Sequence, residues 1–284
     1  MKGLLLRRRK LGLGSCRGIR DASTTGLNFV RNDTMKEEDF NGVDYVFRWG
    51  CTSNVPVKNV INKASAIHLI GDKTRFRKLL RNDQPELIPK TFFSMDEILA
   101  EEEQGPLIIR PKHHAQGKHV YLVRTPQELA EAVQRCGEGW YASEYVDKAQ
   151  EFRVFVSQGR AVWVAEKTPG DPDAVAWNVA KGGRFDNVRW DDWPLKVVRY
   201  AIEAFNYSDL DFGGVDVMVG KDGKVYIIEI NSAPSQTSPY RQSCTAKAFD
   251  YICNNGKGHI PLRGGRGGYK KFIHPAIHEG AELV

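Results

Sequence analysis

The chain lacks several features by which other classes of protein are recognised. Its longest apolar runs extend over only a handful of residues, so no transmembrane helix is expected. Its five cysteines are an odd, scattered set without a CxxC pair, which argues against a disulfide framework or a zinc site. No internal repeat or long low-complexity block is visible. These absences favour a globular protein of the reducing cytoplasm.

Motifs of nucleophilic catalysis and of P-loop nucleotide binding are absent as well. The sequence contains no GxSxG elbow, no GxxxxGK[ST] loop and no Cys–His pairing with a useful context. The first residues, MKGLLLRRRKLGLGS, are basic, but their apolar stretch is too short for a secretory signal. An organelle transit peptide is the alternative, and we do not favour it because the pattern continues directly into sequence typical of a folded domain.

Positive charge is unevenly distributed along the chain. The formal net charge is +6, and residues 1–20 carry seven basic side chains and no acidic one, so the remainder sums to −1. A second basic stretch without acids covers residues 257–271. Such patches indicate a surface for an acidic partner or nucleic acid, or else a solvated N-terminal face and a flexible glycine-rich tail. We favour the solvated interpretation for the tail and leave both open for the N-terminus.

Alternating strand-like and helix-like segments predict α+β lobes rather than a helical bundle. Residues 1–72 contain the short strand patterns GLLLRR, GLNFVR and DYVFRWG, which are typical of a small α/β unit. Two helical pieces follow over 61–82, and Asp72 is placed to cap the second. A later helix is predicted to have Thr125 as its cap and Pro126 at its first position. With 284 residues, the chain has room for two or three lobes.

Two carboxylates and an amide occur in the last pair of predicted strands. The Asp-Gly dipeptide at 222–223 separates two β-type runs and predicts a hairpin with a two-residue turn. In that register Asp216 lies directly opposite Glu229 on one face of the sheet. Asn231 is on the same face, two residues further on, and its partner Gly214 leaves space above the sheet.

Two opposed carboxylates destabilise a strand pair unless something offsets their repulsion. A proton, a lysine or arginine side chain, or a metal ion would each do so. A set of oxygen donors only suits Mg²⁺. The alternative is a surface hairpin whose carboxylates pair with basic side chains. The spacing leaves both open, and in either case the opposite face is predicted to be apolar, with Val217, Val219, Ile228 and Ile230.

From about residue 73 to 253 the order of elements and several motifs resemble the ATP-grasp superfamily. The similarity is greatest to carboxylate–amine ligases of the ribosomal-protein S6 glutamate ligase type. It is carried by the following segments: GGVDVMV with IIEINSAP, similar to the family's magnesium-binding strands; LIIRPKHHAQGKHVYLV, similar to its strand–loop–strand over the triphosphate; SEYVDKAQEFRVFV, similar to its hinge; and NVAKGG, similar to its N-x-x-basic-G-G loop.

The resemblance implies an ATP-grasp fold in which two α+β lobes grip ATP. The lobes would cover 73–146 and 147–255, after a small α/β lobe at 1–72 and before a basic, glycine-rich tail at 256–284. Two Mg²⁺ ions, which Mn²⁺ could replace, would bind to Asp216, Glu229 and Asn231. The remaining nucleotide contacts are implied to be Lys73, Arg110, Lys112, Gln116 and Gly117 at the phosphates, the backbone of Glu144, Tyr145 and Val146 at the adenine, and Glu151 at the ribose.

The family usually has a lysine where this chain has Arg110, so the division of roles between Arg110 and Lys112 stays open. The implied activity is ATP-dependent formation of an amide from a carboxylate and an amine, through an acyl phosphate, with release of ADP and phosphate. The residues implied to contact the reacting groups are Arg153, Lys167, Asn178 and Lys181. In the N-terminal lobe, Arg48 at a strand end is our candidate for binding the substrate carboxylate.

Two other functions stay open beside the ligase. One is an ATP-binding module without turnover, and the other is a ligase or binder that acts on nucleic acid or another polyanion, which the basic patches suggest. The expected partners are small-molecule or protein-terminal carboxylates and amines. Nucleic acid is less favoured, and no membrane is expected.

Overall fold

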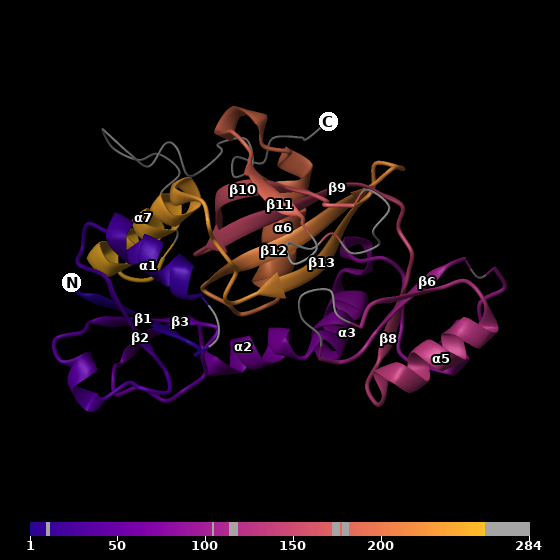
Figure 1. Cartoon of the computed structure of the whole chain (residues 1–284), viewed down its shortest axis with the longest axis horizontal. Coiled ribbons are helices and arrows are strands. Elements are labelled where there is room, and N and C mark those ends of the chain that lie inside the picture. The colour runs from indigo at the N-terminus through magenta and orange to yellow at the C-terminus, as the bar shows by residue number, and fades with distance from the viewer. Residues whose placement is uncertain (10–11, 104, 114–118, 172–176, 178–181, 259–284) are drawn as a thin grey trace.

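The computed structural model describes residues 1–9, 12–103, 105–113, 119–171, 177 and 182–258. Its described strands form three sheets, with helices against them, which confirms the predicted α+β class. Figure 1 shows three regions along the long axis: an N-terminal sheet with α1 and α7, a large central sheet with α6, and a small sheet with α5. No described helix combines the length and apolar composition that a membrane crossing requires.

The boundaries of the principal elements are as follows. The helices are α1 (Leu13–Ala22), α2 (Ala64–Gly71), α3 (Lys73–Asp83), α4 (Met95–Leu99), α5 (Pro126–Cys136), α6 (Leu195–Asn206) and α7 (Pro239–Asn255). The strands are β1 (Gly3–Arg7), β2 (Asn28–Arg31), β3 (Tyr45–Trp49), β4 (Asn59–Ile61), β5 (Thr91–Phe92), β6 (Leu107–Arg110), β7 (Tyr121–Val123), β8 (Tyr141–Glu144), β9 (Lys148–Ser157), β10 (Arg160–Thr168), β11 (Arg184–Asn187), β12 (Phe212–Gly220) and β13 (Val225–Asn231).

The N-terminal sheet has the strand order β2-β1-β3-β4 and is parallel throughout. Strand β3 is buried on both faces, as is usual for a parallel strand covered on two sides. Phe47 and Trp49 point toward α7 and the central sheet, where Phe47 stacks on Phe249 with ring centroids 4.4 Å apart. Trp49 stacks on Phe212 at 5.6 Å. The last described helix therefore packs on one of the first strands.

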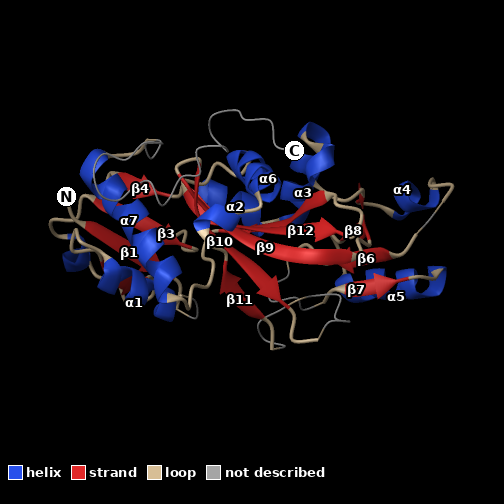
Figure 2. Cartoon of the chain, turned by 90° about the horizontal axis from the view of Figure 1, so that it is seen from above, coloured by secondary structure: helices blue, strands red, loops and turns tan. Residues whose placement is uncertain are grey.

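The central sheet has the order β11-β10-β9-β12-β13 and is antiparallel. On one face, Val215 and Val217 of β12 pack with Val198 and Ala201 of α6 in a continuous apolar core. The apolar residues of α6 recur every three or four positions, so they form one apolar stripe along the helix. Helix α6 lies beside this sheet and contacts β12 and β13 (Figure 2). The opposite face of β12 and β13 carries the polar residues of the site described below.

The small sheet, β5-β8-β6-β7, is covered by α4 and α5. Both predicted helix caps next to it are confirmed. Thr125 accepts from the backbone N–H of Glu128 in a reciprocal capping box, with Pro126 in the first turn of α5. Asp72 accepts from the N–H of Arg75 at the start of α3. These signals are local in sequence, which is why they could be predicted.

Asn62 connects the N-terminal sheet to the central one. It is fully buried, with a left-handed backbone (φ 67°), and its side chain pairs with the start of β12. The Asn62 Oδ1 accepts from the N–H groups of Asp211 at 2.7 Å and Phe212 at 3.0 Å, while Nδ2 donates to the Phe212 carbonyl at 3.0 Å. One side chain thus satisfies three buried backbone groups.

We expect Asn62→Ala to lower the free energy of unfolding by about 2–5 kcal/mol, because it leaves those three groups without partners. Chemical denaturation would measure the loss. The control is Asn59→Ala on β4, whose exposed amide contacts only a surface carbonyl, and which should change stability by about 0.5 kcal/mol at most. Similar losses in the two variants would contradict this role for Asn62.

Candidate active site

Strands β12 and β13 bring the predicted oxygen donors together. Asp216 is paired with Glu229, and Gly214 with Asn231, in an antiparallel register. Both predicted pairings are therefore confirmed. The predicted space above Gly214 is wrong, because the loop after Asn231 fills it: a Cβ there would lie 2.8 Å from Pro234 and 3.5 Å from the Arg153 Cδ.

The turn that joins these strands differs from the prediction. Gly220 donates its N–H to the Lys224 carbonyl at 2.8 Å, and Val219 pairs with Val225, so the loop has three residues rather than two. The register near the turn is consequently one residue away from the predicted one. An irregularity next to Asp216 inserts Ile228 into β13 and restores the predicted register at the site.

The inserted residue also changes which side chains are buried. Ile227, which is 1% exposed, packs in the apolar core, whereas Ile228 is only half-buried, so the predicted place of Ile228 on the apolar face is wrong. Because β13 is the last of the described strands in its sheet, its outward carbonyls have no partner among those strands. The Arg77 guanidinium donates to the Ile228 carbonyl at 2.6 Å, and the Lys73 Nζ donates to that of Ile230 at 3.1 Å. Helix α3 thus covers the edge of the site.

Basic side chains offset the repulsion between the two carboxylates. Arg153, on the neighbouring strand β9, donates from Nε and Nη2 to the two oxygens of Asp216 at 2.6 and 2.7 Å. Burial would lower the pKa of Arg153, but the adjacent Asp216 carboxylate raises it, so the guanidinium remains charged. Glu229 lies 3.5 Å from the Lys73 Nζ and accepts from the Asn231 amide at 2.8 Å.

These contacts are compatible with bound magnesium. Asn231 donates its NH₂ to Glu229, which leaves its Oδ1 available beside the carboxylates. The described residues contain no cluster of three His, Cys, Asp or Glu side chains that could hold a metal ion. A mixed set of two carboxylates and an amide, completed by water and phosphate oxygens, is what Mg²⁺ prefers. The residues therefore fit the ion that the sequence predicts.

Glu151 holds two lysines in the same face of the sheet. It is 3% exposed, and its oxygens accept from Lys148 at 2.7 Å and Lys167 at 2.5 Å. Burial lowers the pKa of Lys148, and Glu151 acts in the opposite direction. In this arrangement Glu151 positions two cations, and its predicted contact with a ribose stays a prediction.

Lys148 is a residue that the sequence did not suggest. Strand alternation from Arg153 and Glu151 places it on the opposite face. The pairing of β9 with β12 shifts by one residue at Ala149, however, so Lys148 pairs with Gly220 and its side chain reaches Glu151. Only the bulge at Ala149 would have identified Lys148, and strand alternation in the sequence does not reveal a bulge.

The other predicted phosphate contacts lie on the small sheet or outside the described residues. Arg110 donates to the Ser143 hydroxyl at 3.3 Å. Lys112 pairs with Asp72 at 3.0 Å, and its carbonyl accepts from the Lys73 N–H at 3.3 Å, so it lies next to the start of α3. The predicted residues outside the described part of the chain are Gln116, Gly117, Asn178 and Lys181.

The segment predicted as the hinge is held by backbone hydrogen bonds to other parts of the lobe predicted at 73–146. Glu144 donates its N–H to the Lys90 carbonyl and Tyr145 to that of Pro106, both at 2.9 Å. Val146 packs against the end of β12, where a Cβ on Gly220 would lie 3.2 Å from its Cγ1.

The site-facing positions of β12 therefore run from Asp216, a predicted metal ligand, to the segment predicted as the hinge. Gly220 lies four residues, about 13 Å, beyond Asp216, with Met218 between them on the same face. Met218 lines this face of the site, and the sequence analysis missed it although strand alternation from Asp216 places it there. The spacing suits one nucleotide, with its phosphates near Asp216 and its base near Gly220.

The structure does not bring Arg48 together with these residues. It lies on the face of the N-terminal sheet opposite Trp49, where its Nη2 donates to the Ser53 carbonyl at 3.1 Å. Burial lowers its pKa. Its predicted role toward a substrate stays a prediction.

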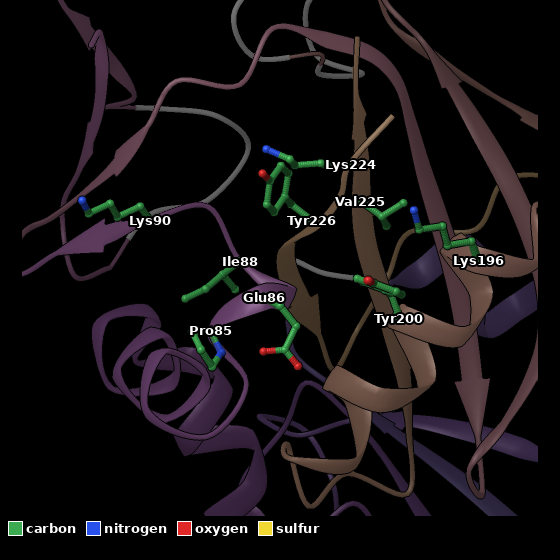
Figure 3. Close-up of a pocket in the computed structure, with 9 residues that line it drawn as sticks. All are labelled: Pro85, Glu86, Ile88, Lys90, Lys196, Tyr200, Lys224, Val225 and Tyr226. Atoms are coloured by element: carbon green, nitrogen blue, oxygen red, sulfur yellow. The ribbon is translucent and has the colours of Figure 1, made fainter. Parts of the chain in front are cut away.

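A separate hollow of about 330 Å³ lies between the turn at Pro85–Leu87, α6 and the start of β13 (Figure 3). Its polar lining consists of Glu86, Lys90, Lys196, Tyr200, Lys224 and Tyr226. None of the predicted site residues that the structure describes lines it, so it is distinct from the carboxylate site.

A family model matches most of the chain. The RimK-like ATP-grasp domain aligns with residues 72–252, which include strands β12 and β13 and the segment predicted as the hinge. Among curated proteins, one named "Probable alpha-L-glutamate ligase" from Thioalkalivibrio sulfidiphilus is 24% identical over 220 residues, covering 73% of this chain and 71% of that protein.

Solved structures agree on the fold. D-alanine–D-alanine ligase from Bacillus anthracis superposes with a TM-score of 0.63 at 15% identity, covering 90% of this chain and 96% of that one. A RiPP-associated ATP-grasp ligase from Chryseobacterium gregarium, solved with ADP and with a leader and core peptide, gives 0.62 at 12% identity, covering 94% and 100%. The predicted ATP-grasp fold is confirmed.

Proposed function

The chain belongs to the RimK-like ATP-grasp family, and we propose that it uses ATP to join a carboxylate to an amine. The observation that supports this most strongly is the arrangement on the polar face of β12 and β13. Two carboxylates and an amide lie beside two cations, Arg153 and Lys73, at one end of a row that leads to the hinge. This is a site for the phosphates of a nucleotide and for a group that receives one of them.

Asp216, Glu229 and Asn231 would hold the Mg²⁺ ions, which neutralise the triphosphate and polarise the phosphoryl oxygens when bound. Lys73 supplies a further positive charge from α3. Arg153 orients Asp216 and lies close enough to the same space to contact a transferring phosphoryl group. Transfer of this kind depends on positioning and on fixed charge rather than on a protein nucleophile.

The proposed reaction has two steps. A substrate carboxylate oxygen attacks the γ-phosphorus of ATP, a new P–O bond forms, and the bond to ADP breaks. The amine nitrogen then attacks the carbonyl carbon of the acyl phosphate, the C–O bond breaks with loss of phosphate, and the nitrogen releases a proton. Lys167, held by Glu151, is placed to stabilise negative charge in these steps.

An ADP-release assay tests the proposal. Purified protein with Mg·ATP should release ADP only when a carboxylate and an amine are both present, and L-glutamate is the first carboxylate to test because a similar protein is named for its ligation. A panel of amino acids, polyamines and short peptides supplies the amines. The joined product is identified by mass spectrometry.

Two results would contradict a ligase. ADP release that is independent of the amine would indicate a different phosphoryl transfer. Tight binding of Mg·ATP without turnover for any pair in the panel would indicate a nucleotide-binding module.

A further inference from the structure

Arg77 is a buried arginine of α3 to which the proposed reaction gives no role. It is 5% exposed and lies one helical turn after Lys73. Its Nη2 donates to the Ile228 carbonyl at 2.6 Å, whereas its Nη1 has no hydrogen-bond partner within the described part of the chain. Burying a guanidinium in this way costs free energy that burying an apolar side chain would not. Stability of the fold alone therefore does not account for the charge of Arg77.

Arg77 lies between the edge of β13 and the small sheet. Burial lowers its pKa to about 10, with Arg110 acting in the same direction and Tyr141 and Glu229 in the opposite one. The guanidinium is therefore still charged at neutral pH. Arg77 and Arg110 each lie 6.0 Å from the centre of the buried Tyr141 ring. The guanidinium of Arg77 thus has the ring on one side and the Ile228 carbonyl on the other.

The carbonyl that Arg77 holds belongs to the peptide bond directly before Glu229. Ile228 is the extra residue of the bulge in β13, and a bulge leaves such a residue unpaired with the neighbouring strand. Arg77 supplies the hydrogen bond that β12 cannot give. The orientation of this peptide group, and with it the direction of the Glu229 side chain, therefore depends on the Arg77 guanidinium.

Lys73 makes the same kind of contact two residues further along β13. Its Nζ donates to the Ile230 carbonyl at 3.1 Å, and this carbonyl belongs to the peptide bond before Asn231. Residues four apart lie on one face of a helix, and carbonyls two residues apart point to one edge of a strand. Two donors of α3 therefore match two carbonyls of β13, and each carbonyl directly precedes a predicted metal ligand.

Helix α3 is itself attached to the small sheet. The Thr74 Oγ1 donates to the Gly139 carbonyl, just before β8, at 2.6 Å. Tyr141 of β8, which packs against Arg77, is paired with Arg110 of β6. Arg77 is thus held in place from the small sheet while it holds β13 of the central one.

We propose that Arg77 is a positioning residue for Glu229. By holding the Ile228 carbonyl, it fixes the peptide group that leads into Glu229 and so directs the carboxylate toward the metal ions. This inference rests on the proposed function, in which Glu229 is a metal ligand. It gives Arg77 no contact with substrate or phosphate.

Loss of positioning and loss of charge have opposite expected effects. Removing a positive charge near a metal site strengthens the binding of a cation, if charge is all that changes. Losing the support of a metal ligand weakens that binding, typically by about 10- to 100-fold. The direction of the change in metal affinity therefore distinguishes the two roles of Arg77.

Binding of Mn²⁺ tests the proposal without turnover. Mn²⁺ is titrated into the full chain at a saturating concentration of a non-hydrolysable ATP analogue, and free Mn²⁺ is measured by electron paramagnetic resonance. We expect Arg77→Met to bind Mn²⁺ roughly 10- to 100-fold more weakly than the wild type. Arg77→Lys keeps a charged donor for the Ile228 carbonyl and should stay within about threefold of the wild type.

A second substitution tests whether Arg77 acts through Glu229. In the Glu229→Gln background, Arg77→Met should weaken Mn²⁺ binding by no more than about threefold, because the carboxylate that it positions is already gone. The matched control is Arg81→Met, one turn further along α3. The Arg81 guanidinium donates to the Thr91 carbonyl and to Glu97 on the side of the small sheet. Its loss should leave Mn²⁺ affinity within about twofold.

Amide hydrogen exchange in the protein without ligands gives an independent measurement. Residues 225–231 should exchange at least about tenfold faster in Arg77→Met, since this strand loses its support, while β9 and β10 keep their protection. Arg77→Lys should restore the slow exchange of residues 225–231.

Four outcomes overturn the proposal: unchanged or tighter Mn²⁺ binding by Arg77→Met, equally weak binding by Arg77→Lys, the full loss repeated in the Glu229→Gln background, or wild-type exchange of residues 225–231 in Arg77→Met. Loss of protection throughout Arg77→Met would show a structural role and would also overturn it. Failure of the ligase function is visible separately, as absence of ADP release from a protein in which Arg77→Met still weakens Mn²⁺ binding.

Discussion

Glu229→Gln should reduce the rate of ADP release by roughly 10³-fold or more. The change keeps the shape of the side chain but removes a charge that offsets Lys73, 3.5 Å away, and that would ligate both metal ions. Loss of one preorganised electrostatic contact in an active site costs about 10²–10³-fold, and this residue makes more than one. The measurement is kcat for ADP release at saturating Mg·ATP, with Mg·ATP affinity determined in parallel.

A matched substitution controls for general effects. Glu86→Gln changes the same chemical group in the hollow of Figure 3, away from the carboxylate site, and should leave kcat within about twofold. If Glu229→Gln retained a tenth or more of wild-type activity, the metal-binding role of the β12–β13 pair would be wrong.

Arg153→Met should both destabilise the fold and abolish activity. It leaves the Asp216 carboxylate, 4% exposed, without the guanidinium that meets both of its oxygens. Removing one partner of a buried ion pair costs about 3–5 kcal/mol, because the other charge stays buried and unpaired. Urea denaturation should show that loss, and ADP release should fall to background.

The double variant Arg153→Met, Asp216→Leu tests whether the lost stability comes from the unpaired Asp216 carboxylate. With both charges replaced by apolar groups, most of the lost stability should return, while activity should not. Arg184→Met, at an exposed ion pair on β11, is the control and should change stability by about 1 kcal/mol at most. A double variant no more stable than Arg153→Met alone would contradict the ion-pair explanation.

Features that depend on neighbouring residues were predictable from the sequence. The caps at Asp72 and Thr125 and the alternation of β12 follow from contacts within a few positions. The pairing of Asp216 with Glu229 was predicted correctly from a turn of the wrong length. The three-residue turn and the extra residue Ile228 displace the register in opposite directions, and their effects cancel at the site.

Features that depend on distant residues were not predictable. The bulge at Ala149 brings Lys148 to Glu151, and it arises from the pairing of β9 with β12, more than sixty positions away. The burial of Arg241 beside the Phe185 carbonyl is likewise a property of the assembled fold, since it depends on which strands surround the start of α7. A single sequence contains no local signal for either.

The contact between Phe47 and Phe249 has a consequence for how the protein is made. About 200 residues separate these two rings in the chain, so at 5–20 residues per second the ribosome needs roughly 10–40 s to deliver the second after the first. During that interval Phe47 lacks its partner on α7, and for most of it Trp49 also lacks Phe212, so this face of the nascent N-terminal sheet is covered only by earlier residues such as Cys16 and Ile19 of α1. Chaperone capture of ribosome-bound intermediates should therefore concentrate on this face and end when α7 emerges.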